Sequence, residues 1–323
     1  MSAPAHLDPR LLRAFVAVAE ELHFTRAAAR LYIAQQALSR DVRRLERELG
    51  AELFVRTTRQ VTPTADGERL LPYARRVLQA QDDLLAAFGQ ARPLLVDLNS
   101  PGLATGRLVL ERARSLAPEQ ELMARYESGL THAAGELVAG RLDASFGRFA
   151  GLPAALRAGL GHQPVRYEPM AVVLPEGHPL ARLDRVPLSA LAGESVYAGA
   201  GNPRTPEWTD LAHRLFEGRG IHVASPAPLA VGEEEFQRIM DKTRNPILAV
   251  QSFPAMHSTV VRPLVDPVPL SPVSLVWRKG LAHPALDALR RAASQVATEK
   301  GWLGVPDGGW IPAADAAVMS VHK

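Results

Sequence analysis

The sequence contains no cysteine. Disulfide bonds, thiolate nucleophiles and cysteine-based zinc sites are therefore excluded, and the composition fits a reducing cytoplasm. Lysine is also scarce: only four of the 37 basic residues are lysines, and the first of them is Lys242. No run of about 18 apolar residues occurs, and the N-terminus lacks the pattern of a secretory signal. We therefore expect a cytoplasmic protein that neither spans a membrane nor is exported.

Catalytic and metal-binding motifs are missing as well. No Walker-type loop, G-x-S-x-G, H-E-x-x-H or dinucleotide G-x-G-x-x-G stands between a strand and a helix, and the histidines do not cluster at metal-ligand spacing. The acids of "GEEEF" fit the first turn of a helix better than a metal site. The sequence predicts no catalytic residue, no metal and no cofactor, and hence no enzyme. Its 323 residues and 47% apolar content predict two or three globular units.

Arginine is concentrated near the N-terminus. The stretch "FTRAAARLYIAQQALSRDVRRLERELGAELFVRTTR" holds eight arginines and four acids. Helical spacing predicts one helix over residues 11–22, a second that begins at Thr25 as N-cap, and a third over about 35–49 that ends at Gly50.

The third helix is predicted to have two different faces. At about 100° per residue, one face collects four apolar side chains and the opposite face collects four polar ones. The apolar set, expected to pack inward, is Leu38, Val42, Leu45 and Leu49. The outer set is Gln36, Arg40, Arg43 and Arg47.

A hairpin is predicted after this helix, in "AELFVRTTRQVTPTADGE", with its turn around Thr57, Thr58 and Arg59. Three helices followed by a hairpin make a winged helix-turn-helix. Guanidinium groups pair with guanine edges or phosphates, so the pattern favours double-stranded DNA as partner. An arginine-rich helix face taken alone could also be a solvated surface. The order of three helices followed by a hairpin favours a DNA-binding surface over a solvated one.

The segment from about residue 7 to 85 resembles the DNA-binding region of LysR-type transcriptional regulators. The resemblance is carried by "LLRAFVAVAEELHFTRAAARLYIAQQALSRDVRRLERELGAELFVRTTRQVTPTADGERLLPYARRVL" and implies that "QQALSRDVRRLE" is the recognition helix. Three positions depart from the family. They are Ala34, where serine is common and where no side chain can cap the helix, Gln36, where proline or serine is common, and Thr58, where glycine is frequent. The expected DNA-binding residues are Thr25, Arg26, Gln35, Gln36, Ser39, Arg40, Arg43, Arg47, Arg56 and Arg59.

A long helix is predicted from Thr64 to about Phe88, with apolar residues repeating every seven positions. Such a seam indicates coiled-coil pairing with a second copy, although it could also pack on its own domain. Pro72 predicts a kink. The resemblance implies a homodimer through this helix, an inverted-repeat operator and a homotetramer through the C-terminal domains. The expected interface residues are Leu70, Leu71, Val77, Leu78, Leu84 and Leu85.

Strand and helix patterns alternate beyond residue 92, which predicts a doubly wound α/β effector-binding domain. Segments near 164–168 and 261–270 would cross between two lobes around a hinged cleft, as in periplasmic binding proteins. "GRLDASFG" and "AVVLPEGHPLA" resemble the LysR-type effector domain. The predicted α/β protein divides into a winged helix-turn-helix (1–63), a linker and dimerisation helix (64–91), an effector domain (92–301; lobe I about 92–164 and 266–301, lobe II about 165–265) and a loosely extended tail (302–323). In the tail, Trp302 and Trp310 are candidates to dock on the body.

Loops after the strands are expected to hold a small-molecule effector, because α/β folds bind ligands there. Ser100 could instead be a plain turn residue, and Arg148 and Arg204 could be merely solvated. The candidate effector residues are Asn99, Ser100, Arg148, Gly199, Arg204 and Asn245.

Together these patterns predict a sequence-specific DNA-binding regulator modulated by a small molecule. A regulator without an effector stays open. A solute-binding protein is disfavoured, because it would need an export signal and no N-terminal DNA reader.

Overall fold

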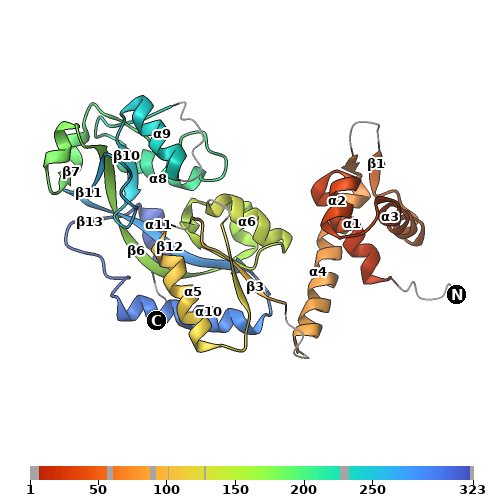
Figure 1. Ribbon diagram of the computed structural model, residues 1–323. Helices are drawn as coiled ribbons and strands as arrows, with labels where there is room; N and C mark the ends of the chain where they lie inside the picture. The colour runs from red at the N-terminus through yellow and green to blue at the C-terminus, as the bar shows by residue number, and fades with distance from the viewer. Residues whose placement is uncertain are drawn as a thin grey trace. The chain divides into compact units, whose positions relative to one another are not determined.

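The computed structural model divides the chain into two compact units, residues 1–91 and 92–323. Figure 1 labels their helices and strands. Within the described ranges no helix combines the length and apolarity needed to cross a membrane. The residues described are 7–56, 61–87, 92–100, 102–126, 129–225 and 233–320.

The first unit is the predicted winged helix-turn-helix with its long helix. Its elements are α1 (Pro9–Glu21), α2 (Phe24–Arg30), α3 (Gln35–Leu49), the antiparallel strands β1 (Phe54–Arg56) and β2 (Val61–Pro63), and α4 (Ala65–Ala87). Asp8 caps α1 by accepting from the backbone N–H of Arg10, and Pro9 occupies the first turn, where no N–H is needed. The core centres on Phe15, which is fully buried.

Two details of this unit differ from the sequence prediction. The N-cap of α2 is His23, not Thr25: the His23 Nδ1 accepts from the Thr25 N–H at 3.1 Å. Leu49 was expected to pack inward, but it is 37% exposed. Leu49 is the last residue of α3, because Gly50, with a φ of 66°, ends the helix. No further turn of the helix follows to cover the Leu49 side chain.

Lobe I of the second unit is an α/β layer with helices on both faces. Its strands follow the order β4-β3-β5-β12-β6, with β3 parallel to β4 and β5, and β12 antiparallel to β5 and β6. These are β3 (Leu94–Asp97), β4 (Leu122–Arg125), β5 (Ala144–Gly147), β6 (Leu160–Pro175) and β12 (Val268–Arg278). The helices are α5 (Ala104–Leu116), α6 (Leu130–Ala139), α7 (Ala154–Ala158) and α10 (Pro284–Glu299), with the short turn η1 (Phe149–Gly151).

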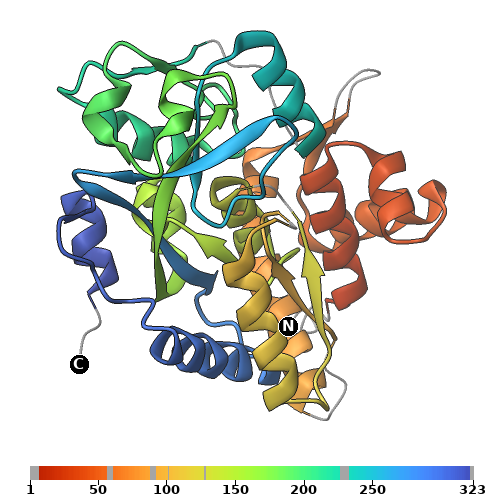
Figure 2. The ribbon, with the colours of Figure 1, turned by 60° about the vertical axis from the view of Figure 1, so that its left-hand side comes forward.

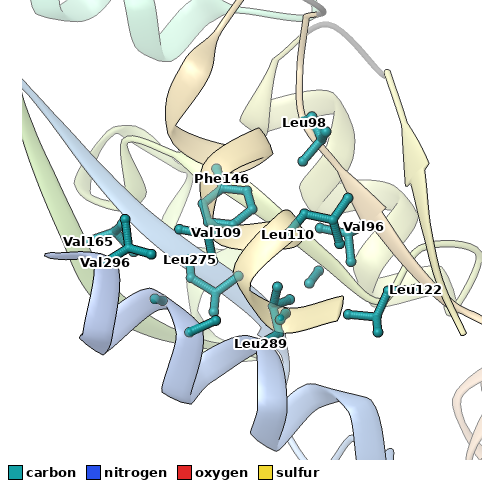
Figure 3. Close-up of a cluster of buried hydrophobic side chains, with 14 of the residues drawn as sticks. Val96, Leu98, Val109, Leu110, Leu122, Phe146, Val165, Leu275, Leu289 and Val296 are labelled. Carbon is teal, nitrogen blue, oxygen red and sulfur yellow. The ribbon is translucent and has the colours of Figure 1, made fainter. Parts of the chain in front are cut away.

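Side chains alternate between the two faces of this sheet, as the pleat requires. Leu275 faces α5 and α10, whereas its neighbour Val276 faces α6. Figure 3 shows the first face, where Phe146 from the sheet meets Leu110 of α5 and Leu289 of α10. Each fully buried leucine of this kind contributes roughly 1.5–3 kcal/mol by leaving water.

Lobe II shares the long strand β6 with lobe I. Residues 160–169 of β6 pair with β12, and residues 170–175 pair with β10 and β11, so β6 runs through both lobes. This is the crossing predicted near residues 164–168. The other elements are η2 (Pro179–Arg182), β7 (Val186–Pro187), η3 (Leu188–Leu191), β8 (Ser195–Val196), α8 (Pro206–Phe216), β9 (His222–Val223), α9 (Glu233–Thr243), β10 (Ile247–Val250) and β11 (Thr259–Val265).

The C-terminal tail was expected to extend loosely, with Trp302 and Trp310 as candidates to dock on the body; its described residues, 302–320, instead pack on both lobes and include both tryptophans. Trp302 joins the core of lobe I. Trp310, in β13 (Gly309–Trp310), packs against the core of lobe II, and Val318, in α11 (Ala313–Met319), packs against lobe I again. Figure 2 shows α11 in blue beside the strands that join the lobes. Apolar burial therefore fixes the tail across both lobes.

Candidate nucleic-acid interface and effector site

Helix α3 separates an apolar inner face from a polar outer face. Leu38, Val42 and Leu45 are fully buried against α1, as the helical period predicted. Ser39 is half-buried. The exposed residues of the helix include Gln35, Gln36, Arg40, Arg43 and Arg47.

The arginines around α3 fall into a paired and an unpaired group. Arg44 pairs with Glu48 at 2.8 Å, and Arg10 forks onto Asp41 at 2.9–3.0 Å. Within the described ranges the Arg40 and Arg43 side chains have no hydrogen bond or ion pair. Since no group in the described part of their unit neutralises them, their charge is available to an external anion.

Five arginines border an open hollow of about 900 Å³ along α3, together with three acids. The arginines are Arg10, Arg40, Arg43, Arg44 and Arg47, and the acids are Asp41, Glu46 and Glu52. The Arg47 Nε donates only a long bond, 3.4 Å, to the backbone oxygen of Arg43. A hollow edged by guanidinium groups suits a polyanion better than a neutral ligand.

The N-terminus of α3 has no side-chain cap, as predicted from Ala34. The residue two positions earlier, Tyr32, is 96% exposed and has a φ of 55°. Because no side-chain oxygen accepts from the first N–H groups of α3, these donors are open to a phosphate oxygen.

The remaining predicted DNA contacts lie around α2 and the wing. Thr25 is exposed, whereas Arg26 is held by Glu21, whose backbone oxygen accepts from the Arg26 Nη2. Arg56 lies in β1 opposite Val61, and Arg59 lies outside the described residues. Arg56 and Arg59 stay predictions.

The predicted dimer residues of α4 divide into two groups. Leu70, Leu71 and Leu78 pack against the core of their own unit. Val77, Leu84 and Leu85 are exposed, Leu84 by 58%. The first group is half-buried and the second is exposed, and a role of either group in a dimer interface stays a prediction.

Asn99 follows β3 and is used internally. Its φ is 60°, its side-chain amide donates to the Phe146 backbone oxygen, and its side-chain oxygen accepts from the Gly129 N–H at 3.1 Å. Gly129 in turn lies against the backbone oxygen of Arg204, since a Cβ there would meet it at 2.3 Å. The structure thus brings Asn99 and the Arg204 backbone together from different lobes.

The other candidate effector residues lie in loops. Ser100 and the Arg204 side chain are exposed, and Asn245 is half-buried. Gly199 has a φ of 66° and turns the chain after the isolated bridge at Tyr197. An effector role for these residues stays a prediction.

Arg148 is the candidate whose surroundings differ most from the expectation. It is 5% exposed, and its Nε and Nη2 donate to Asp315 of α11 at 2.8–3.1 Å. Its Nη1 donates to Asp210 at 2.6 Å and to the Glu207 backbone oxygen at 3.0 Å. The guanidinium is thus occupied by groups of lobe II and the tail.

Sequence reasoning missed Glu207, whose side chain crosses between the lobes. Its carboxylate accepts from the Leu130 N–H at 2.9 Å and from the Thr131 Oγ at 2.6 Å, at the start of α6. Burial raises the pKa of Glu207, and these hydrogen bonds oppose the rise. The only sequence signal, an acid after Thr205 and Pro206, is equally typical of any first helical turn.

Comparison with known proteins places both units. Residues 9–68 match the bacterial regulatory helix-turn-helix protein family, lysR family, and residues 101–233 match the LysR substrate binding domain. The transcriptional regulator XapR of Escherichia coli is 32% identical over 302 residues, which cover 89% of this chain and 98% of XapR. The chain belongs to the LysR family of transcriptional regulators.

A second sequence relative and a solved structure are also similar to this LysR-type regulator. The uncharacterized regulator YnfL of Escherichia coli is 37% identical over 196 residues, which cover 58% of this chain and 64% of YnfL. Full-length CbnR, solved in complex with its target DNA, shares the fold with a TM-score of 0.62 at 21% identity, covering 90% of this chain and all of CbnR.

Proposed function

We propose that this LysR-type regulator binds double-stranded operator DNA through the outer face of α3 and so controls transcription in the cytoplasm. The observation that carries the proposal is that the side chains of Arg40 and Arg43 are exposed and have no partner in the described part of their unit, beside an uncapped helix N-terminus. Arginine forks read guanine in the major groove, and helix N-termini bind phosphate. We infer that the chain acts as a regulator and not as an enzyme.

Two copies are proposed to act together through α4. Val77, Leu84 and Leu85 lie on α4 and are exposed. Burying them between two copies would form a homodimer and present two α3 helices to successive major grooves of an inverted repeat. A homotetramer would follow from a second contact between effector domains.

A small molecule bound between the two lobes is proposed to modulate the regulator by changing the placement of the paired DNA-reading helices. A regulator that needs no small molecule is the second candidate. It is favoured by the occupied state of Arg148, whose donors are met by the chain's own carboxylates.

The DNA proposal is tested with Arg43→Ala and, as matched control on the same helix, Arg44→Ala. Operator DNA would be isolated by selection with the purified protein from a random library, and affinity measured by gel shift at fixed salt. We expect Arg43→Ala to weaken binding about 10–100-fold, because a base or charged phosphate contact is worth roughly 1–3 kcal/mol. Arg44 is already paired with Glu48, so its variant should lose far less. Equal losses in both would contradict the assignment.

A further inference from the structure

Helix α8 of lobe II is docked by its first turn onto lobe I. Its inner side chains, among them Leu211 and Leu215, belong to the core of lobe II. The Glu207 carboxylate nevertheless reaches the start of α6, whose own side chains Leu130 and Ala134 belong to lobe I. The contact therefore joins two separate hydrophobic cores.

A second contact reinforces the first. Arg148 follows β5 of lobe I, and its Nη1 donates to both the Glu207 backbone oxygen and the Asp210 carboxylate of α8. Asp315 of the tail, 1% exposed, holds the other side of the same guanidinium. One buried cation thus ties lobe I, lobe II and the tail together.

The backbones meet closely at this junction. A Cβ added to Gly151 of lobe I would meet the Glu207 Cβ at 2.7 Å and the Arg148 Nη1 at 3.1 Å. A Cβ on Gly129 would meet the Arg204 oxygen and the Thr205 Cγ2 at 2.3 and 2.5 Å. Only glycine permits the lobes to come this near at both places.

The Glu207 carboxylate bridges the two lobes as a bound ligand would, but it belongs to the chain itself. A carboxylate at the first N–H groups of a helix is favoured by the helix dipole, and two charge-assisted hydrogen bonds fix its position. Separation of the lobes would leave the Leu130 N–H without its acceptor and Arg148 without its Asp210 partner, to be met by water alone. We call the arrangement in which α8 contacts α6 and Arg148 the closed arrangement; groups from both lobes stabilise it.

We propose that Glu207 and Arg148 form an internal latch that holds the two lobes closed without a small molecule. The closed arrangement is then the resting state of the domain, and any signal that works through lobe movement has to open the α6–α8 contact. The link from the latch to transcription rests on the proposed function. The latch itself is measured on the protein without DNA, so a wrong latch proposal can be distinguished from a wrong DNA-binding proposal.

Interlobe distance is the direct readout. The chain has no cysteine, so Ser115→Cys in α5 and Ser189→Cys in η3 place one spin label on each lobe, at exposed positions. Pulsed electron spin resonance on full-length protein, diluted with unlabelled chain to remove distances between copies, would give the distance distribution. In the otherwise unchanged chain we expect one narrow, short distribution.

Glu207→Ala should lengthen and broaden this distribution and lower Tm by several degrees. Glu207→Gln, which still offers an oxygen to the Leu130 N–H, should retain most of the closed population. Glu217→Ala, an exposed acid at the other end of α8, is the matched control and should change nothing. Acetate, compared with chloride at equal ionic strength, should restore the short distance in Glu207→Ala, because it can enter the space of the lost carboxylate.

An unchanged distance in Glu207→Ala would overturn the latch. Lengthening that appears equally in Glu207→Gln and does not recover in acetate would also overturn it, since packing and not the carboxylate would then hold the lobes. If Glu207→Ala gives too little folded protein, Gly151→Ala tests the same contact by wedging a methyl group against the Glu207 Cβ. A short distance retained in Gly151→Ala would contradict the proposal.

Discussion

The arginines of α3 and the arginine after β5 show how one residue type serves two opposite purposes. Arg40 and Arg43 are exposed and have no partner in the described part of their unit. Arg148 is buried, and carboxylates of two other elements surround it. An exposed guanidinium without a partner keeps its charge for an external anion, whereas a buried one has already found its anions within the chain.

This difference explains why exposure and pairing matter more than arginine content. A chain with four lysines among 37 basic residues carries arginine both at buried, paired positions and at exposed positions for which we propose DNA binding. Arginines that are already paired, such as Arg44 with Glu48, add little to binding and little to stability, because exposed ion pairs are weak. Variants at the two kinds of arginine should therefore give opposite patterns of stability and affinity.

The largest effect on stability is expected from Arg148→Ala. It leaves the Asp315 carboxylate, 1% exposed, without its cation. Breaking a buried pair from one side costs about 3–5 kcal/mol, so the free energy of unfolding in urea should fall by that amount, while Arg43→Ala should change it by less than about 0.5 kcal/mol.

The double variant Arg148→Met with Asp315→Leu is the control for this loss. It removes both charges, and we expect it to recover much of the stability. If Arg148→Ala and Arg43→Ala were equally stable, the distinction between the two regions would be wrong.

A smaller loss is expected from Asp315→Asn. The side chain keeps its size and one acceptor oxygen, but the charge that faces the Arg148 guanidinium is removed. We expect a loss of about 1–3 kcal/mol, measured by the same urea titration. The matched variant Asp287→Asn, on exposed α10 surface with an ion-pair distance of 3.8 Å, should be neutral within error. A neutral Asp315→Asn would show that the tail is held by Met319 and its apolar neighbours alone.

The two regions also differ in how far the sequence predicts them. The outer face of α3 follows from a period of 3.6 residues, and the missing cap follows from Ala34, because both are local properties of a helix. The partners of Arg148 lie 62 and 167 residues away along the chain. Nothing in the local pattern around Arg148 distinguishes a solvated loop arginine from one closed in by distant carboxylates.

The lobed α/β fold was predictable from local sequence patterns, whereas the packing of the tail was not. Alternating strand and helix patterns recur from Leu94 onward and specify the layers through local periodicity. The tail, by contrast, is rich in glycine, alanine and proline, so its pattern is typical of a loose end. Trp302 and Met319 are nevertheless buried on lobe I, through contacts with residues distant along the chain that the local pattern does not reveal.

The smallest effect concerns His162, a half-buried basic ring that, among the described residues, has no carboxylate partner, unlike Arg148. It stacks on Phe149 at 4.1 Å, and its Nδ1 has no hydrogen-bond partner. Burial, aided by the charge of Lys279, lowers the pKa of His162 below its ordinary value of about 6.5. The neutral ring is therefore favoured in the folded state, and its contribution is complete above pH 6.5 and is lost as pH falls through the lowered pKa.

His162→Phe keeps the stacking and removes this titration. Compared with the unchanged chain, the variant should lose less of its free energy of unfolding between about pH 7 and pH 5. Parallel pH profiles for the two proteins would show that His162 does not titrate in this range. Glu207, whose pKa is raised by burial, titrates in the opposite sense, and the difference between the two profiles removes its contribution.

The proposal that the outer face of α3 binds DNA is tested most directly by the salt dependence of operator binding. Each phosphate neutralised by a protein cation contributes about 0.9 to the slope of log affinity against log salt concentration. The triple variant Arg40→Ala, Arg43→Ala, Arg47→Ala should therefore show a shallower slope, by about one or more per chain, whereas Arg44→Ala should keep that of the unchanged protein. A triple variant that keeps both the slope and the affinity of the unchanged protein would contradict the account.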